Sequence, residues 1–417
     1  MAQLDKETFS TSGAPLSVEA AVALIAKRVP AIEETEKVDL LAAAGRVLAQ
    51  PLIAPIDLPA FDNSAVDGYA ARSRDLAIGS ATELPIRGRI AAGHAPQTLS
   101  AENGALRIFT GAPVPEGFDR VFMQEDCTLA DGNVLLPSDP SKGANIRRRG
   151  EDIAKGTEAI ARGRRLMPED IGLAAALGTT GITVRRELKV AIFSTGDEIV
   201  SPGVSLPPAA IYDANRFMLH AMLQRLGVRV HDLGILPDVR ERTASALLEA
   251  AHAFDLVITS GGVSMGEEDH VKAVLETRGS LAFWKLAIKP GRSVAMGVLD
   301  GTPFIGLPGN PVAVFVCFAT LVRPLIAALN GAQPEPLHRQ KVIAGFSFRK
   351  KPGRREYLRV SLRRDSSGAI IAEKYAVQGS GALTSLTRTQ GLLELHEDVT
   401  EIACGDRVDF IDYELMR

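Results

Sequence analysis

The segment Asp255-Leu-Val-Ile-Thr-Ser260 runs directly into Gly261-Gly-Val-Ser-Met-Gly266-Glu-Glu-Asp269, and Thr302-Pro-Phe-Ile305 runs into Gly306-Leu-Pro-Gly-Asn-Pro311. In each case an apolar run typical of a buried strand opens into a glycine-containing loop. A loop of this kind, followed by a helix, can present several backbone N–H groups to an anion. The two segments therefore predict phosphate or oxyanion binding at the ends of two strands.

The surrounding sequence, residues 187–330, alternates between strand and helix patterns. Alternation of this kind predicts a mainly parallel sheet covered by helices on both faces. Ligands of such sheets bind at the carboxyl ends of the strands, where both glycine loops fall. The expected strands are 189–194, 228–233, 256–260 and 302–305, and the expected helices are 215–226, 240–253 and 269–277.

The rest of the chain predicts three further domains. Helical patterns at 17–28, 40–48 and 168–177 indicate an elongated N-terminal domain I made of residues 1–50 and 151–186. Short apolar runs broken by Gly, Pro and Asp indicate a small β domain II, residues 51–150, inserted into it. Strand alternation in residues 331–417 indicates a C-terminal β barrel, domain IV. The α/β segment 187–330 is then domain III.

The composition excludes several classes of protein. The chain has 417 residues, 46% of them apolar and 23% charged, with a net charge of −3 and three cysteines. Such a balance gives no global attraction to nucleic acid or to an anionic membrane. Widely spaced cysteines fit a reducing compartment, and no targeting segment is evident, so we expect a cytoplasmic protein. The apolar run Val312–Val322 stops at Arg323-Pro324, too short for a bilayer, and predicts a buried helix.

Polar groups at the predicted strand ends suit anion or metal binding. Ser260 and Ser264 add hydroxyl donors to a loop in which Gly261 and Gly262 allow close backbone approach. An acid such as Asp269 beside an anion loop often holds Mg²⁺, although it could instead satisfy the N-terminus of the next helix. The segment Ser194-Thr-Gly-Asp-Glu198 leaves the same two alternatives open.

Two lysines lie between the glycine loops, in Phe283-Trp-Lys285-Leu-Ala-Ile-Lys289-Pro-Gly-Arg292. Alternation along a strand would place both charges on one face. An exposed strand face is the alternative, but the position between two anion-type loops favours oxyanion binding. The Gly306–Pro311 loop combines two prolines and two glycines, which shapes a pocket at low entropic cost.

Other motifs have no role on generic grounds. The basic run Asn145–Asp152 and the cluster Arg349–Arg355 are typical of solvated surfaces, while Phe61–Ala70 and Thr110–Pro115 are constrained segments without an evident chemistry. The sequence contains no Ser-His-Asp order, no P-loop and no Cys/His metal spacing, which argues against nucleophilic hydrolase chemistry and P-loop phosphoryl transfer.

Taken together, these segments resemble the molybdopterin molybdenumtransferase family, of the MoeA and gephyrin E-domain type. The resemblance covers nearly the whole chain. The matching motifs are Phe61-Asp-Asn-Ser-Ala-Val-Asp-Gly-Tyr-Ala, Thr110-Gly-Ala-Pro-Val-Pro-Glu-Gly, Asn145-Ile-Arg-Arg-Arg-Gly-Glu-Asp, Ser194-Thr-Gly-Asp-Glu, Ile211-Tyr-Asp-Ala-Asn-Arg, Gly261-Gly-Val-Ser, Phe283-Trp-Lys-Leu-Ala-Ile-Lys-Pro-Gly and Gly306-Leu-Pro-Gly-Asn-Pro-Val.

The resemblance implies a reaction. Enzymes of this family take adenylylated molybdopterin and molybdate, hydrolyse the pyrophosphate bond with Mg²⁺ present, and release AMP and molybdenum cofactor. It also implies a homodimer, in which the Mog-like domain III of one subunit faces domain II of the other across a shared cleft. A Mog-type adenylyltransferase and molybdoenzyme maturation proteins are possible further partners.

The resemblance also implies roles for individual residues. The expected catalytic set is Asp67, Asp152, Glu198, Asp238, Asp269, Lys285 and Lys289, with Glu198, Asp238 and Asp269 as Mg²⁺ ligands. The expected substrate contacts are Thr110, Arg147, Ser260, Gly261, Gly262, Ser264, Pro308, Gly309, Asn310, Pro311, Arg354 and Ser380. Met265 and Arg292 depart modestly from the family pattern. Adenylylation of molybdopterin, the preceding step, and a gephyrin-like scaffold without catalysis are the alternative functions.

Overall fold

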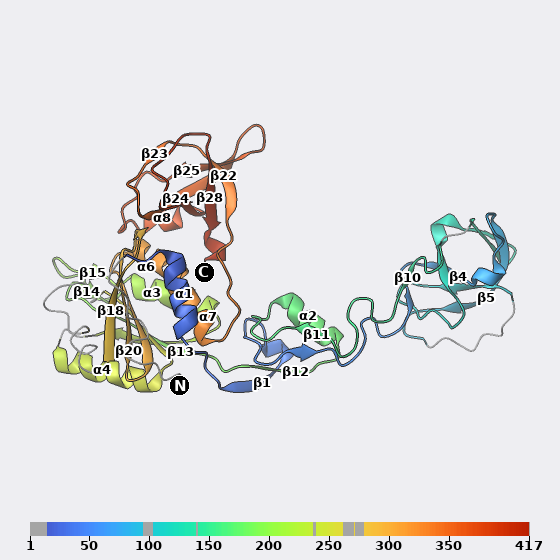
Figure 1. Cartoon of the computed structure of the whole chain (residues 1–417), viewed down its shortest axis with the longest axis horizontal. Helices are drawn as coiled ribbons and strands as arrows, with labels where there is room; N and C mark the ends of the chain where they lie inside the picture. Colours follow the sequence, from blue (N-terminus) through green and yellow to red (C-terminus); the bar gives the residue numbers. More distant parts are fainter. Residues whose placement is uncertain are drawn as a thin grey trace.

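The computed structural model describes residues 15–94, 103–138, 141–236, 239–261, 271 and 279–416, without the side chains of residues 240, 281–284 and 415. The chain is elongated (Figure 1). A small β region forms one end, a six-stranded sheet and a barrel form the other, and a thin arm of paired strands joins them. The four-part architecture of the family fold is thus present, while the domain limits given above stay predictions.

The α/β region is built on a sheet with the strand order β16-β13-β17-β21-β20-β18. The first four strands are parallel, and β20 runs antiparallel to both of its neighbours, β21 and β18, so the prediction of a mainly parallel sheet is confirmed. The strands are β13 Lys189–Ser194, β16 Arg229–Ile235, β17 Leu256–Ser260, β18 Gly279–Lys285, β20 Ser293–Leu299 and β21 Thr302–Leu307.

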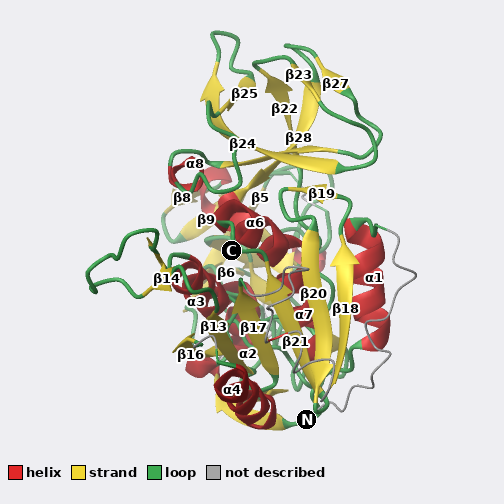
Figure 2. Ribbon diagram, turned by 90° about the vertical axis from the view of Figure 1, so that its left-hand side faces the viewer, coloured by secondary structure: helices red, strands yellow, loops and turns green. Residues whose placement is uncertain are grey.

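Both faces of this sheet are covered by helices (Figure 2). Along β13, Val190 and Ile192 join one apolar cluster, while Ala191 and Phe193 join another on the opposite face. A central strand buried on both sides reads as a continuous apolar run, which is why its limits could be predicted. The covering helices are α1 Val18–Arg28, α3 Asn215–Arg225, α4 Arg240–Ala253, α6 Pro311–Cys317 and α7 Arg323–Leu329.

The helix that follows β21 is longer than the sequence indicated. It continues from α6 through a π-helical turn, Phe318–Val322, into α7, so the predicted stop at Arg323-Pro324 is wrong. Pro324 lies in the first turn of α7, where its missing N–H costs little. The run Pro311–Leu329 has a mean hydropathy of 2.3 and enough length to cross a membrane, but 78% of it is buried inside the protein. It is a core helix.

The C-terminal region is a closed barrel, as predicted. Its ring closes because β24 pairs with both β25 and β26. A short strand from the α/β region, β19 Ile288–Lys289, adds to β24 and connects the two regions. The barrel strands are β22 Gln340–Ala344, β24 Arg355–Arg364, β25 Ile370–Lys374, β26 Gly391–Leu395 and β28 Arg407–Asp412, with β23 Phe348–Arg349, β27 Glu401–Ile402 and α8 Thr384–Thr387 beside them.

The arm is made mainly of strand pairs, so the expectation of a helical first domain is not confirmed. The pairs join β1 Thr35–Asp39 to β12 Gly181–Arg185, and β2 Leu52–Ile53 to β11 Glu158–Ile160, with α2 Pro168–Ala176 beside them. Helix α1 packs on α7 instead. The helix expected at 40–48 is wrong beyond a 3₁₀ turn, Leu40–Ala42, because the N–H groups of Gly45 and Leu48 bond to Leu166 and Arg164 across the arm.

The inserted β region hangs at the far end of the arm. Its sheet has the order β7-β4-β6-β5-β9-β8. The chain enters and leaves side by side, since the N–H of Leu58 lies 2.8 Å from the carbonyl oxygen of Ile153. The strands are β3 Asn63–Ser64, β4 Gly68–Ala71, β5 Thr82–Ile90, β6 Ala105–Ile108, β7 Arg120–Met123, β8 Thr128–Ala130, β9 Asn133–Leu136 and β10 Ile146–Arg147.

Candidate functional site

Three neighbouring strands of the α/β sheet end at the same level. Ser194 of β13 is in register with Ser260 of β17, and Ser260 is in register with Leu307 of β21. The loops that follow these three residues therefore meet at the carboxyl edge of the sheet. We call this place the strand-end site.

Two glycines allow the first two loops to approach each other. Gly261 has a φ of +85°, and a Cβ placed on it would lie 2.5 Å from the carbonyl oxygen of Thr195. Gly196 has a φ of +140°, and its Cβ would lie 2.6 Å from Oε2 of Glu198, an exposed side chain that turns back over the loop. A larger residue at Gly261 would clash with backbone, and one at Gly196 would be strained by its positive φ and would displace the Glu198 side chain.

The third loop, Pro308–Pro311, is held by contacts from helix α3 and from the barrel. The Nδ2 atom of Asn215, the first residue of α3, donates to the carbonyl oxygen of Gly309 at 2.7 Å and to Oγ of Ser260 at 2.9 Å. The N–H of Val312 donates to the carbonyl oxygen of Ser380 at 3.0 Å, which brings the barrel to the same edge. Ser260, Pro308–Pro311 and Ser380 are thus close together, as their predicted roles require.

Several buried polar atoms at this edge have no hydrogen-bond partner among the described residues. They are Oγ of Ser194, Oγ1 of Thr195 and Oδ1 of Asn215. Buried polar groups are nearly always paired, so three unpaired ones at one edge of the sheet indicate a place for ligand or ordered water. All three donor or acceptor atoms are oxygens.

The two lysines lie differently from the prediction. Lys285 ends β18, whereas Lys289 belongs to the separate strand β19, so they are not alternate residues of one strand. Nζ of Lys289 lies 3.3 Å from Oε2 of Glu356, whose side chain is only 4% exposed. Lys289 is itself 56% exposed and can still face an anion while it offsets the buried carboxylate. The pairing with Glu356 was not foreseen, because Glu356 looked like an ordinary strand residue.

Four of the expected residues lie outside the described part of the chain. They are Asp238, Gly262, Ser264 and Asp269. Of the three expected Mg²⁺ ligands, only Glu198 is therefore described. Within the described ranges no group of three His, Cys, Asp or Glu side chains is placed to hold a metal ion. Arg354 is partly buried, and its carbonyl oxygen accepts from Nζ of Lys350 at 2.7 Å.

The other predicted site residues lie in the β region. Oδ1 of Asp67 accepts from both the N–H and the hydroxyl of Thr110, each at 2.8 Å. The backbone hydrogen bond from Thr110, followed by its hydroxyl, holds the pKa of Asp67 below its usual range. Asp67 is therefore a carboxylate at neutral pH and keeps lone pairs for a further donor.

Next to this pair, the basic run Asn145–Asp152 is an ordered loop and not a merely solvated face. Arg147 pairs with Glu151 at 2.8 Å, Arg148 with Asp62 at 2.6 Å and Arg149 with Asp57 at 2.6 Å. Asp152 is exposed at the end of the loop. The sequence signal for this order was present in the aspartates before the run, but spacing alone could not pair them.

The two sets of predicted residues are not brought together within one chain. Asp67, Thr110, Arg147 and Asp152 belong to the β region and its junction with the arm, whereas the strand-end site lies in the region at the opposite end of the long axis (Figure 1).

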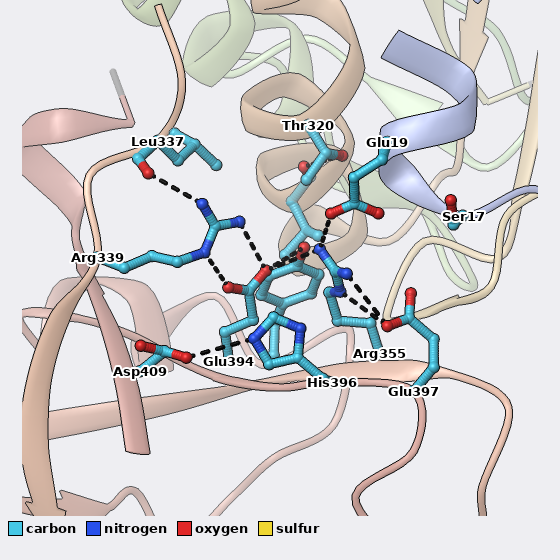
Figure 3. Close-up of polar contacts among 12 residues, drawn as sticks. Ser17, Glu19, Thr320, Leu337, Arg339, Arg355, Glu394, His396, Glu397 and Asp409 are labelled. Atoms are coloured by element: carbon cyan, nitrogen blue, oxygen red, sulfur yellow. Dashed lines mark hydrogen bonds and ion pairs between the residues drawn. The ribbon is translucent and has the colours of Figure 1, made fainter. Parts of the chain in front are cut away.

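A further polar cluster lies at the junction between α1 and the barrel (Figure 3). Its centre is Arg355, whose side chain is 5% exposed and which contacts Glu19 at 2.6 Å, Glu397 at 3.1 Å and Glu394 at 3.2 Å. The hydroxyl of Tyr357 also donates to Glu394, which is fully buried. Arg339 adds a second cation to Glu394. We call these residues the junction network.

The barrel also contains a pocket of about 340 Å³. It is lined by Lys341, Glu394, Leu395, His396, Val399, Glu401, Ile402, Asp406, Arg407 and Val408. None of the predicted site residues is among them. The pocket mixes acids, bases and aliphatic side chains, whereas the predicted chemistry is concentrated at the strand ends.

Comparison with known proteins covers nearly all of the chain. Residues 16–178 match the family described as MoeA N-terminal region (domain I and II), residues 191–328 match a probable molybdopterin binding domain, and residues 341–413 match the MoeA C-terminal region (domain IV). The molybdopterin molybdenumtransferase of Haemophilus influenzae is 40% identical, over 94% of this chain and 97% of its own.

Two further relatives agree. Molybdopterin molybdenumtransferase 2 of Mycobacterium tuberculosis is 36% identical, over 90% of this chain and 94% of its own. The crystal structure of the molybdopterin biosynthesis MoeA protein from Pyrococcus horikoshii superposes with a TM-score of 0.79 at 28% identity, covering 96% of this chain and all of that one.

Proposed function

The chain belongs to the MoeA family of molybdopterin molybdenumtransferases, and from this membership we propose that it inserts molybdenum from molybdate into adenylylated molybdopterin, with hydrolysis of the pyrophosphate bond and release of AMP. The family resemblance inferred from the sequence is confirmed over almost the full length. Relatives with this name are transferases of molybdenum cofactor biosynthesis. The strand-end site is the feature of the molecule that carries the finer proposal.

The strand-end site supports the proposal because it suits an extended, multiply charged substrate. Backbone loops after three strands and the Ser260 hydroxyl offer hydrogen-bond donors to phosphate or molybdate oxygens, and the exposed ammonium group of Lys289 would add positive charge. Ser380 brings the barrel to the same edge through its contact with Val312. A donor set made of loops from two regions fits a substrate that joins a pterin, a pyrophosphate and a molybdate.

We propose that the cleft is completed by a second copy of the chain. Asp67, Thr110 and Arg147 lie at the opposite end of the long axis from the strand-end site, so one subunit alone cannot join them (Figure 1). Large apolar side chains are exposed on the arm and beside the strand-end site. Leu41 of the arm is 99% exposed, and Ile211 and Phe217 beside the strand-end site are 55% and 50% exposed. Large exposed apolar residues favour an interface between copies.

In this cleft the chain's own residues would divide the work. Asp67, kept ionised by Thr110, can accept a hydrogen from an attacking water and orient it. Lys289 and the glycine loops offset charge that builds up on the broken pyrophosphate. Glu198, Asp238 and Asp269 would hold Mg²⁺, because hard cations prefer oxygen ligands, and its charge would assist the same stabilisation. No covalent nucleophile is needed.

The two alternative functions are less well supported. An adenylyltransferase of the preceding step would not need the match of residues 16–178 to the MoeA N-terminal region. A purely scaffolding protein would not need the ordered Asp67–Thr110 pair. A cytoplasmic site of action and cooperation with a Mog-type adenylyltransferase belong to the same proposal.

The test is AMP release from adenylylated molybdopterin in the presence of molybdate and Mg²⁺. Lys289→Ala should lower turnover by about two orders of magnitude, the loss typical of one removed oxyanion donor. Lys341→Ala is the matched control, since Lys341 is 62% exposed and pairs with Asp409 much as Lys289 pairs with Glu356. Unchanged turnover in Lys289→Ala would contradict the assigned role.

Mixing two inactive variants tests the shared cleft. Asp67→Asn and Lys289→Ala subunits, each inactive alone, should recover about a quarter of the wild-type rate after exchange, because half of the dimers are mixed and each has one intact cleft. Light scattering should show a dimer. No recovery in a mixture proven to contain mixed dimers would place both residues in the same subunit's site.

A further inference from the structure

Asn215 lies at the meeting point of the strand-end loops. Its Nδ2 atom is 2.9 Å from Oγ of Ser260 and 2.7 Å from the carbonyl oxygen of Gly309. The two contacts join the end of β17 to the Pro308–Pro311 loop. They also use both hydrogens of the amide group.

The chemistry of the partners fixes the direction of these hydrogen bonds. A carbonyl oxygen can only accept, so the amide atom facing Gly309 must be the nitrogen. The same nitrogen faces Ser260, and the serine oxygen therefore accepts. A hydroxyl that accepts in this way still has its own hydrogen to donate, and no described residue accepts it. Ser260, which is 4% exposed, is held as a donor.

The neighbouring polar atoms show the same imbalance. The hydroxyl oxygens of Ser194 and Thr195 and Oδ1 of Asn215 are buried without partners in the described part of the chain. Ser194 is the register neighbour of Ser260 on the next strand. Gly261, after Ser260, has no side chain to block the approach of a ligand. The hydroxyl groups of Ser194, Thr195 and Ser260, each with a hydrogen free to donate to a ligand, therefore line one edge of the sheet.

We propose that Asn215 is a positioning residue, which ties the Pro308–Pro311 loop to β17 and commits the Ser260 hydroxyl to donating its hydrogen to a substrate oxyanion. The oxyanion is an oxygen of the pyrophosphate group or of molybdate. This inference rests on the proposed function, which supplies the anion. Asn215 acts through Ser260 and need not touch the substrate itself.

The experiment reverses the polarity of Asn215 at constant shape. In Asn215→Asp a carboxylate replaces the amide, so it accepts the Ser260 hydrogen and repels the Gly309 carbonyl. Affinity for inorganic pyrophosphate, measured by calorimetry on the full-length protein, should fall about tenfold to a hundredfold, as expected for a lost hydrogen bond to a charged group. Asn133→Asp is the control, since Asn133 donates to Glu83 in the β region at 2.9 Å. It should bind pyrophosphate like the wild type.

A double variant shows whether Asn215 acts through Ser260. Asn215→Asp combined with Ser260→Ala should weaken pyrophosphate binding no more than the stronger single variant, because both remove the same donor. In turnover, the KM for adenylylated molybdopterin should rise more than kcat falls. Additive losses, or pyrophosphate binding within twofold of wild type in Asn215→Asp, would overturn the proposal. If Asn215→Asp does not fold, Asn215→Ala, which only removes the bridge, carries the same double-variant test.

The outcome is distinguishable from a failure of the proposed function. If wild-type protein binds pyrophosphate and Asn215→Asp does not, the positioning role stands even if adenylylated molybdopterin is not turned over. If the wild type turns that substrate over but Asn215→Asp does so equally well, the function stands and the positioning role is wrong. Absence of any pyrophosphate binding by the wild type would also overturn the positioning role.

Discussion

The junction network and the strand-end site are both polar, both largely buried, and opposite in how their atoms are paired. Arg355 contacts three carboxylates. The buried carboxylate of Glu394 pairs with Arg355 and Arg339 and accepts a hydrogen bond from the hydroxyl of Tyr357. At the strand-end site the hydroxyls of Ser194 and Thr195 have no partner among the described residues. In the junction network each buried carboxylate has a counter-charge, although Oε1 of Glu397 has no partner among the described residues, whereas the strand-end site leaves several hydroxyl groups unpaired.

The difference separates stability from function. A buried charge without a counter-charge is strongly unfavourable, so the buried members of the network must stay paired for the barrel to fold. Unused polar atoms lower stability slightly, and a chain retains them where a ligand completes them. Variants in the network should therefore affect folding, and variants at the strand ends should affect activity.

The largest expected effect is in the network. Arg355→Ala removes the central cation of the junction network and leaves Glu394, which is fully buried, with Arg339 as its remaining ion-pair partner. The free energy of unfolding should fall by about 3–5 kcal/mol, as when one partner of a buried pair is removed. Chemical denaturation measures it. Arg349→Ala is the control, because Arg349 is 82% exposed and pairs with the half-exposed Glu401. An equal, small loss in both variants would remove the contrast between the two regions.

A smaller effect of opposite sign is expected at the strand ends. Ser194→Ala removes a buried hydroxyl that has no partner among the described residues, so the free energy of unfolding should stay equal or rise by up to about 1 kcal/mol, while turnover falls. Ser385→Ala is the matched control, since the fully buried Ser385 hydroxyl donates to Ala382 at 2.6 Å and accepts from Arg359 at 3.1 Å. That variant should lose about 1–3 kcal/mol. Equal losses would show that Ser194 is satisfied in the folded protein.

Glu19→Gln sharpens the comparison within the network. Glu19 is the member contributed by α1, and its side chain is 61% exposed. Solvent screens its pairing with Arg355, which keeps two other carboxylates, so the loss should stay below about 1 kcal/mol. Thermal unfolding at neutral pH measures it. A loss as large as that of Arg355→Ala would mean that α1, and not the barrel interior, anchors the network.

The smallest effect concerns acid. Burial raises the pKa of Glu19, but the hydrogen bond from Arg355, a backbone hydrogen bond and the charges of Arg355 and Arg339 together outweigh it, so the net pKa is lowered. Backbone hydrogen bonds, aided by the arginines, likewise lower the pKa of Asp57, Asp62 and Glu151. Because these folded-state values lie below the unfolded ones, their stabilisation is full above about pH 4.5 and is lost as the pH falls further.

Scanning calorimetry between neutral pH and acid follows this loss. The Tm should fall as the pH drops below the usual pKa values of carboxyl groups. The Tm of Asp62→Asn should fall less steeply than that of the wild type, because the variant lacks one carboxyl group with a lowered pKa. Parallel curves for the two proteins would show that the ion pairs of the arginine loop do not contribute to stability.

The fold was predictable where one segment carries its own signal. β13 and β17 are buried on both faces, and their continuous apolar runs gave the correct limits, as did the periodicity of α4. The segment 40–48 failed because its N–H groups bond across the arm, which no local pattern reveals. The long helix after β21 failed because a π-turn carries it past the Arg323-Pro324 signal.

The site was predictable as chemistry and not as partners. Glycine loops indicated an anion site, and the structure places Ser260, Pro308–Pro311 and Ser380 together. Lys289 and Glu356 are 67 positions apart in the sequence, and Asn215 and Gly309 are 94 positions apart. Both contacts therefore depend on the tertiary fold and could not be predicted from local sequence. The contact between Glu19 and Arg355 in the junction network likewise depends on the tertiary fold and could not be predicted from the sequence.

Because the chain enters the inserted β region at Leu58 and leaves it at Ile153, side by side, this region could be removed as a unit. Its two chain ends are already at hydrogen-bonding distance, so a two- or three-residue turn could replace everything between them with little loop-closure entropy. The remaining chain would keep the sheet, the barrel and the strand-end site. In evolution, replacement of the inserted β region at these two positions could change the substrate specificity of the proposed cleft. The strand-end site, which is proposed to bind the anion, would stay unchanged.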